Sequence, residues 1–166
     1  MPIDLKTITL TRYDQARHQE LMEELDHKDS KSRFIHSIKD RLISSSYQKD
    51  FSFASAYVVE KNNIPIGYTY LSPRNKDTVF IEISLLKQAR GRGLGSRTLM
   101  EASDYLFTKY NIKEVRADVD PSNEKSMNML LNCGFSPDEE EYAQRGYTGK
   151  IEFVKDSYCY QSKRRK

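Results

Sequence analysis

The chain has 166 residues, of which 37% are hydrophobic and 31% charged, and its formal net charge at pH 7 is +3. The composition excludes an intrinsically disordered chain, and so small a charge does not indicate nucleic-acid binding. No apolar run approaches the roughly 18–20 residues that a membrane-spanning helix needs, and residues 1–5 lack the pattern of a signal peptide. We therefore expect a cytoplasmic protein without nucleic-acid or membrane partners, with one domain over residues 1–160 and a solvated basic tail over 161–166.

The first half of the chain predicts a strand, two helices and a hairpin. Alternating side chains predict a strand over residues 5–10. Helices are predicted over 13–25 and 30–46, and the second carries a continuous apolar stripe. The stripe consists of Phe34, Ile35, Ile38, Leu42 and Ile43. Strand-like runs over 53–60 and 64–71 flank the turn residues Lys61, Asn62 and Asn63, which is the pattern of a hairpin.

The second half alternates predicted strands and helices. The expected elements are a strand over 77–86, a helix over 95–110, a strand over 114–119, a helix opened by Pro121 and ended by Gly134, and strands near 141–147 and 152–160. The order is therefore β-α-α-β-β-β-α-β-α-β-β. A crossover around the helix at 95–110 implies parallel pairing and the hairpin implies antiparallel pairing, so we expect an α/β (α+β) fold with a mixed sheet.

Residues 88–95 read Gln-Ala-Arg-Gly-Arg-Gly-Leu-Gly and lie between a predicted strand and a predicted helix. Glycines let backbone N–H groups approach a ligand and permit positive φ, and a helix N-terminus adds free N–H donors. This combination is typical of a cradle for phosphate oxygens. The segment lacks the lysine of a P-loop, and Ser96 replaces the last glycine of a dinucleotide-binding fingerprint. It fits the pattern R-x-x-G-x-G, starting at Arg90.

This pattern resembles the acyl-CoA pyrophosphate loop of the GNAT superfamily of N-acetyltransferases. A second segment strengthens the resemblance: Asn123-Glu124-Lys125-Ser126 is followed, after a predicted helix, by Gly134-Phe135. It looks like the N-x-x-[SA] helix of the same superfamily, and its N-x-x-S form is similar to the branch that acetylates the N-termini of ribosomal proteins. The two motifs span residues 80–135, in the order that the superfamily has. The resemblance implies a GNAT-like, mostly antiparallel sheet.

The resemblance also implies which residues bind acetyl-CoA. The loop would hold the pyrophosphate through its backbone amides, with added charge from its arginines. The loop residues are Arg90, Gly91, Arg92, Gly93, Leu94, Gly95 and Ser96. The end of the preceding strand, Leu85, Leu86 and Lys87, would pair its backbone with the pantetheine amides. Asn123 would contact the pantetheine region, cap the helix that follows it, or do both.

Acyl transfer to an amine needs a base for the amine proton and an acid for the leaving thiolate. Glu82 lies between apolar residues in the strand before the loop, so its carboxylate should face a cleft or form an ion pair, and it is the candidate base. Many GNAT members carry a tyrosine acid at the position that is Leu130 here. Ser126 is the substitute candidate, with helix capping as the alternative role. Tyr142 and Tyr147 are further candidate donors.

The leading interpretation is an N-acetyltransferase in which the acceptor amine attacks acetyl-CoA directly in a ternary complex. The acceptor is either a protein N-terminus or lysine, or a small-molecule amine. The acidic run at 138–141 favours a cationic acceptor, and a homodimer is possible for this superfamily. Two other interpretations stay open: a non-catalytic acyl-CoA-binding regulatory module, which Leu130 would suit, and a nucleotide-binding protein. No metal is expected, because Cys133 and Cys159 lack metal-ligand spacing.

Overall fold

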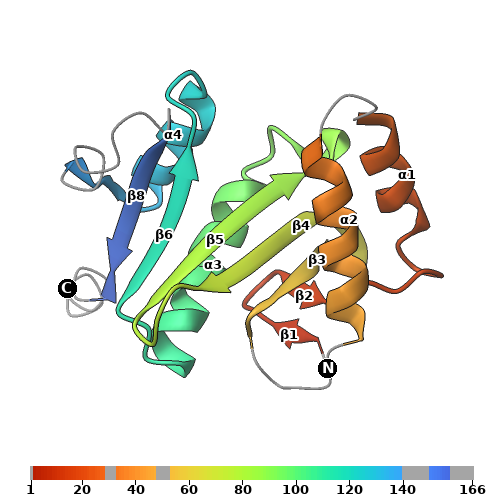
Figure 1. Cartoon of the computed structure of the whole chain (residues 1–166), viewed down its shortest axis with the longest axis horizontal. Helices are drawn as coiled ribbons and strands as arrows, with labels where there is room; N and C mark the ends of the chain where they lie inside the picture. Colours follow the sequence, from red (N-terminus) through yellow and green to blue (C-terminus); the bar gives the residue numbers. More distant parts are fainter. Residues whose placement is uncertain (1, 29–32, 48–52, 140–149, 158–166) are drawn as a thin grey trace.

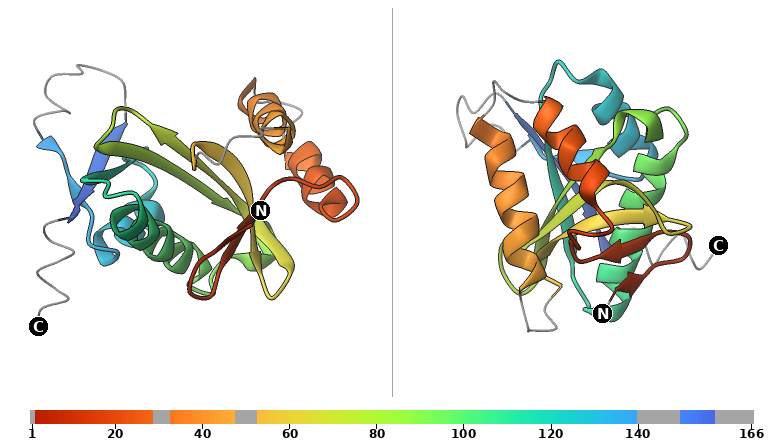
Figure 2. Two further views of the ribbon diagram at one scale, coloured as in Figure 1. Left: turned by 90° about the horizontal axis from the view of Figure 1, so that it is seen from below. Right: turned by 90° about the vertical axis from the view of Figure 1, so that its right-hand side faces the viewer.

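A mixed sheet of eight strands carries helices on both faces in the computed structural model, which describes residues 2–28, 33–47, 53–139 and 150–157 (Figures 1 and 2). The strands are β1 (Ile3–Asp4), β2 (Thr9–Thr11), β3 (Ser55–Lys61), β4 (Ile64–Pro73), β5 (Thr78–Leu85), β6 (Glu114–Val119), β7 (Ser136–Pro137) and β8 (Ile151–Asp156). The helices are α1 (Gln19–Lys28), α2 (Arg33–Ser46), α3 (Leu94–Lys109) and α4 (Glu124–Asn132), with a short 3₁₀ helix η1 (Lys87–Ala89).

The strand order is β1-β2-β3-β4-β5-β6-β8-β7, and β5 and β6 are the parallel pair among the described strands. Helix α2 covers one face of the sheet, over β3, and α3 covers the other face, against β5 and β6 (Figure 2). The expected mixed, mostly antiparallel fold is confirmed. In the described part of the chain no helix is both long and apolar enough to cross a bilayer.

Local signals predicted the middle of the chain well. The turn between β3 and β4 holds Asn62 and Asn63 at φ of 52° and 63°. Two successive residues at positive φ form the tight hairpin turn that matches the twist of the strands, and asparagine tolerates this conformation. Gly134, at φ 88°, ends α4 as predicted. The predicted strand at 141–147 and the basic tail lie outside the described residues.

Of the predicted helix and strand boundaries that are wrong, three are explained by tertiary or turn contacts. Residues 3–11 form a hairpin of β1 and β2, with residues 5–8 as its connection, rather than one strand over 5–10, because the Glu101 carboxylate on α3 accepts the backbone N–H groups of Thr7 at 2.7 Å and Ile8 at 3.0 Å. Helix α4 begins at Glu124 rather than at Pro121, because Asp120 accepts the N–H of Ser122 in a turn that precedes the helix.

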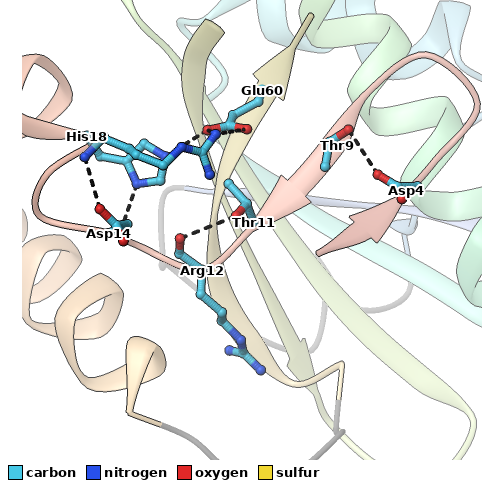
Figure 3. A network of polar contacts seen from close by, with 8 residues as sticks. Asp4, Thr9, Thr11, Arg12, Asp14, His18 and Glu60 are labelled. Carbon is cyan, nitrogen blue, oxygen red and sulfur yellow. Dashed lines mark hydrogen bonds and ion pairs between the residues drawn. The ribbon is translucent and has the colours of Figure 1, made fainter. Parts of the chain in front are cut away.

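The first helix starts at Gln19, not at residue 13, because a buried polar cluster fixes the preceding turn (Figure 3). His18 is fully buried, and its Nδ1 accepts the backbone N–H of Asp14 at 2.9 Å. The imidazole therefore carries its proton on Nε2, which donates to Glu60 Oε1 at 2.8 Å. Arg17 spans both oxygens of Glu60, at 2.8 and 2.9 Å. The cluster attaches the start of α1 to β3.

We expect Glu60→Gln to lower the free energy of unfolding by about 2–3 kcal/mol, because an amide replaces a buried carboxylate that accepts charge-assisted hydrogen bonds. Urea denaturation followed by circular dichroism measures the loss. The matched control is Glu23→Gln, the same change at an exposed position of α1, which should alter stability by less than about 0.5 kcal/mol. Equal losses in the two variants would contradict a stabilising role for the buried cluster.

Candidate functional site

A cleft opens where two neighbouring parallel strands separate. Strands β5 and β6 pair only over Thr78–Phe80 and Glu114–Arg116, and their carboxyl ends then diverge (Figure 1). The cleft has a volume of about 420 Å³ and is lined by side chains from β4, β5, β6, α2, α3 and α4, together with Asp120, Asn123 and Lys150. Because strand separation leaves backbone N–H and C=O groups without a sheet partner, such an edge suits a ligand that itself carries amides.

The glycine loop follows directly on β5 and η1. Gly91 and Gly93 lie at φ of 74° and 73°, and Gly93 is the residue that precedes α3. Within the described chain, none of the backbone N–H groups from Gly91 to Ser96 donates a hydrogen bond. Successive free amides beside a helix N-terminus form an anion-binding concavity. The predicted pyrophosphate residues therefore lie together in a loop whose chemistry fits phosphate oxygens.

The members of this loop differ in what they do in the protein. Arg90 turns back and donates from Nε to the Leu85 carbonyl at 3.1 Å, while the Arg92 side chain is exposed. Helix α3 begins at Leu94, one residue before the predicted start. A Cβ on Gly95 would lie 3.1 Å from Met129 Sδ and 3.5 Å from a Leu85 methyl carbon. The third glycine of the motif therefore permits close packing of α3 against α4 and β5.

Two backbone N–H groups at the end of β5 already have partners. Leu86 donates to the Ile66 carbonyl at 2.9 Å, and Lys87 donates to Glu24 Oε1 on α1 at 2.8 Å. In an antiparallel pair the backbone groups of alternate residues point to opposite sides. Since Leu86 points towards β4, Leu85 and Ile83 point towards the side where β6 has moved away. The structure thus favours Ile83, together with the N–H of Leu85, over Leu86 and Lys87 as backbone partners of a bound amide, because the Leu85 carbonyl already accepts a hydrogen bond from Arg90.

Glu82 lies on β5 and lines the cleft, where 36% of its side chain is exposed. Its Oε2 is 3.4 Å from Nη1 of Arg41 on α2, and the Arg41 guanidinium carbon lies 4.5 Å from the centre of the Tyr70 ring. Glu82 therefore both faces a cleft and forms an ion pair, the two placements that the sequence allowed. A carboxylate open to the cleft can accept a proton from an amine held there.

Asn123 and Ser126 lie on the α4 side of the same cleft. Asn123 Oδ1 accepts the Ser126 N–H at 3.2 Å, so Asn123 is the N-cap of α4. Capping therefore does not occupy the Ser126 hydroxyl. Leu130 also lines the cleft but is only 3% exposed and packs in the core. Tyr142 and Tyr147 lie outside the described residues.

Several residues of the cleft were missed by sequence reasoning. They are Arg41, Tyr70, Ser72, Asp118, Asp120 and Lys150. Arg41 carried a signal: it stands between Ile38 and Leu42, which are buried, so a cation lies on the sheet-facing side of α2. Asp138, the first residue of the acidic run at 138–141, forms an ion pair with Arg116 at 2.8 Å rather than facing an acceptor.

Two groups have shifted pKa values here: Tyr68, which lies on β4 outside the lining of the cleft, and Asp120, which lines it. Burial, followed by the nearby Glu82 charge, raises the pKa of Tyr68 to about 12, so this phenol on β4 stays protonated. Hydrogen bonds from Ser122 lower the pKa of Asp120, with a smaller contribution from Lys150, so Asp120 stays ionised. Among the described residues no group of three or more His, Cys, Asp or Glu side chains is placed to hold a metal ion.

Comparisons with known proteins agree with this geometry. The family model described as "Acetyltransferase (GNAT) family" matches residues 10–135. No curated protein matches the chain in sequence. Similar solved structures include a GNAT-family acetyltransferase from Bacillus anthracis (12% identity, 94% of this chain and 98% of that chain, TM-score 0.71) and an acetyltransferase from Agrobacterium tumefaciens (14%, 95% and 95%, 0.70). A third is spermidine N-acetyltransferase from Vibrio cholerae with CoA and spermine (16%, 93% and 98%, 0.70). At these identities the likeness is one of fold.

Proposed function

Because the chain belongs to the acetyltransferase (GNAT) family, we propose that it transfers an acetyl group from acetyl-CoA to a primary amine by direct attack in a ternary complex. The observation that carries the proposal is that an anion-binding loop and a cleft with polar side chains lie next to each other along β5. A loop of unpaired amides follows β5, and the cleft beside β5 places a half-exposed carboxylate on one side and a serine hydroxyl on the other. These parts match the needs of a phosphate-bearing thioester donor and an amine acceptor.

In this proposal the backbone amides of Gly91 to Ser96 hold the pyrophosphate, and Arg92 adds charge. Arg90 is 3.1 Å from the Leu85 carbonyl through its Nε, so it would contribute after turning away from that carbonyl or with its remaining N–H groups. Ile83 and Leu85 offer backbone groups to the pantetheine amides, and Asn123 fixes the start of α4 beside them. Bound acetyl-CoA supplies the acetyl group as an activated thioester.

The chemistry at the other end falls to side chains of this chain. The acceptor amine is the nucleophile, so no covalent intermediate on the protein is needed. As the new C–N bond forms and the C–S bond breaks, Glu82 takes the amine proton and the departing sulfur receives a proton through the Ser126 hydroxyl or a water that it holds. Leu130 cannot donate a proton, and it keeps this part of the cleft apolar.

The test is release of CoA thiol from acetyl-CoA in the presence of amines, with the acetylated product identified by mass spectrometry. We expect thiol release that depends on both substrates and a product acetylated at nitrogen. The acceptor set includes peptides with free N-termini, amino acids, polyamines and amino sugars. Stabilisation by acetyl-CoA with no thiol release on any acceptor would favour the alternative, a non-catalytic acyl-CoA-binding module, and stabilisation by an adenine nucleotide alone would favour a nucleotide-binding protein.

A further inference from the structure

Arg41 is a cation that reaches into the acceptor side of the cleft from α2. Its guanidinium lies over the Tyr70 ring, with 4.5 Å from Cζ to the ring centre, and makes one contact with Glu82, at 3.4 Å. The Arg41 and Glu82 side chains are 40% and 36% exposed. Within the described chain the guanidinium has no other hydrogen-bond partner. The aromatic ring holds the guanidinium in place, and most of its N–H groups stay open to the cleft.

Two opposite charges side by side at the wall of a cleft form a recognition pattern. A guanidinium fork binds a carboxylate through two parallel hydrogen bonds, and the carboxylate of Glu82 binds an ammonium group. An α-amino acid carries a carboxylate and an ammonium group a few ångströms apart. Bound with its carboxylate on Arg41 and its ammonium group on Glu82, it can pair with both side chains at once. Its amino group would then lie on Glu82, the proposed base.

We propose that the acceptor is an amine with a carboxylate close to its amino group, such as a free α-amino acid, and that Arg41 selects it by binding that carboxylate. The inference rests on the acetyl transfer proposed above and names the acceptor class for the same cleft. Arg41 acts here in specificity: it positions the amine and takes no part in the proton transfers.

The position of Arg41 argues against placing a second ammonium group of a polycationic acceptor beside Glu82, although the carboxylates that line the cleft, Glu82, Asp118 and Asp120, outnumber its cations, Arg41 and Lys150. A second ammonium group near Glu82 would meet the positive charge of Arg41, and like charges at this range repel. On the other wall Lys150 lies close enough to Asp120 to affect its ionisation, so Lys150 balances a carboxylate there. Asp138, the described start of the acidic run, pairs with Arg116 and so is committed within the protein.

The experiment compares matched acceptors that differ only in the carboxylate. Each of the standard amino acids is assayed beside its α-amide, with spermidine included, and kcat/KM is measured by CoA thiol release against the total amine concentration. We expect the best acceptor to be an amino acid that exceeds its own amide by about 10- to 100-fold, the range of a charge-assisted hydrogen-bond pair. Arg41→Gln should bring this ratio close to one, mainly by raising KM for the amino acid.

Two further variants and one binding measurement separate this role from a structural one. Arg41→Lys keeps the charge and loses the fork, so it should retain only part of the ratio. Lys76→Gln removes one positive charge from an exposed turn outside the cleft and should leave the ratio unchanged. Acetyl-CoA affinity should be the same in Arg41→Gln as in wild type, because the glycine loop is intact.

The outcomes distinguish the two proposals. Preference for an amide or for spermidine, or a ratio that persists in Arg41→Gln, would overturn the carboxylate inference while leaving acetyl transfer in place. Absence of thiol release with every amine tested would overturn both.

Discussion

Gly93→Val is expected to weaken acetyl-CoA binding by on the order of 100-fold, because it removes at least one or two charge-assisted hydrogen bonds from the proposed pyrophosphate cradle. Gly93 holds φ at 73° immediately before α3, a conformation that a β-branched residue rarely adopts. A valine would therefore pull the loop out of the shape that aligns its amides. Isothermal titration of wild type and variant with acetyl-CoA measures the change directly.

A second substitution at Gly93 distinguishes two causes of lost acetyl-CoA affinity: a changed loop conformation and a side chain that blocks the ligand from the backbone. In the protein alone, a Cβ on Gly93 would meet no atom within 4 Å. Asparagine tolerates positive φ, as Asn62, Asn63 and Asn111 do in this chain. Gly93→Asn should therefore keep the fold of the loop, and any remaining loss of affinity measures how closely the ligand approaches the backbone.

The matched control for strain is Gly134→Ala. Gly134 has φ of 88° at the end of α4, outside the loop, so alanine there costs roughly 1–2 kcal/mol of folding stability without touching the cradle. Its acetyl-CoA affinity should equal that of wild type. If Gly93→Val binds acetyl-CoA as wild type does, or if Gly134→Ala weakens binding equally, the cradle is not where we place it.

Features that depend on residues close in sequence could be predicted. The turn at Asn62 and Asn63, the glycine that ends α4, and the cap of α4 by Asn123 each follow from the backbone preference or the short side chain of one residue. The same holds for the glycine loop, because positive φ and free amides are local properties. The fold class followed from the order of such elements together with the family resemblance.

The rest of the site depends on contacts between distant residues, which periodicity does not reveal. Glu101 holds the backbone of Thr7 across 94 positions, Glu24 holds that of Lys87 across 63, and Arg41 meets Glu82 across 41. Each contact joins one helix to a different element, so its existence depends on how the layers pack. The first contact replaces a predicted strand by a hairpin, and the second occupies a backbone N–H group that was predicted to bind the ligand. The third lies on the side of the cleft where we propose that the acceptor binds.

Glu82→Gln is expected to lower kcat/KM by about 10²–10⁴-fold at neutral pH, the usual contribution of a positioned base. An amine acceptor with a pKa near 8, as for an α-amino group, or near 10, as for lysine, is mostly protonated at pH 7. The wild-type protein can remove that proton in the cleft, whereas the variant can react only with the acceptor molecules that are already unprotonated in solution. The deficit should therefore be largest at low pH and shrink about tenfold per pH unit as the acceptor deprotonates.

The shape of the pH profile distinguishes a base from a residue that only binds or positions the acceptor. Two control variants change other groups of the same cleft: Asp118→Asn neutralises a second carboxylate, and Ser126→Ala removes the candidate acid. Neither variant should show the steep rise of kcat/KM with pH that is expected for Glu82→Gln. Loss of ammonium binding alone would raise KM at every pH by a similar factor. A Glu82→Gln profile parallel to that of wild type would therefore assign Glu82 to binding and give the proton to water, whereas a profile that converges at high pH identifies its carboxylate as the base.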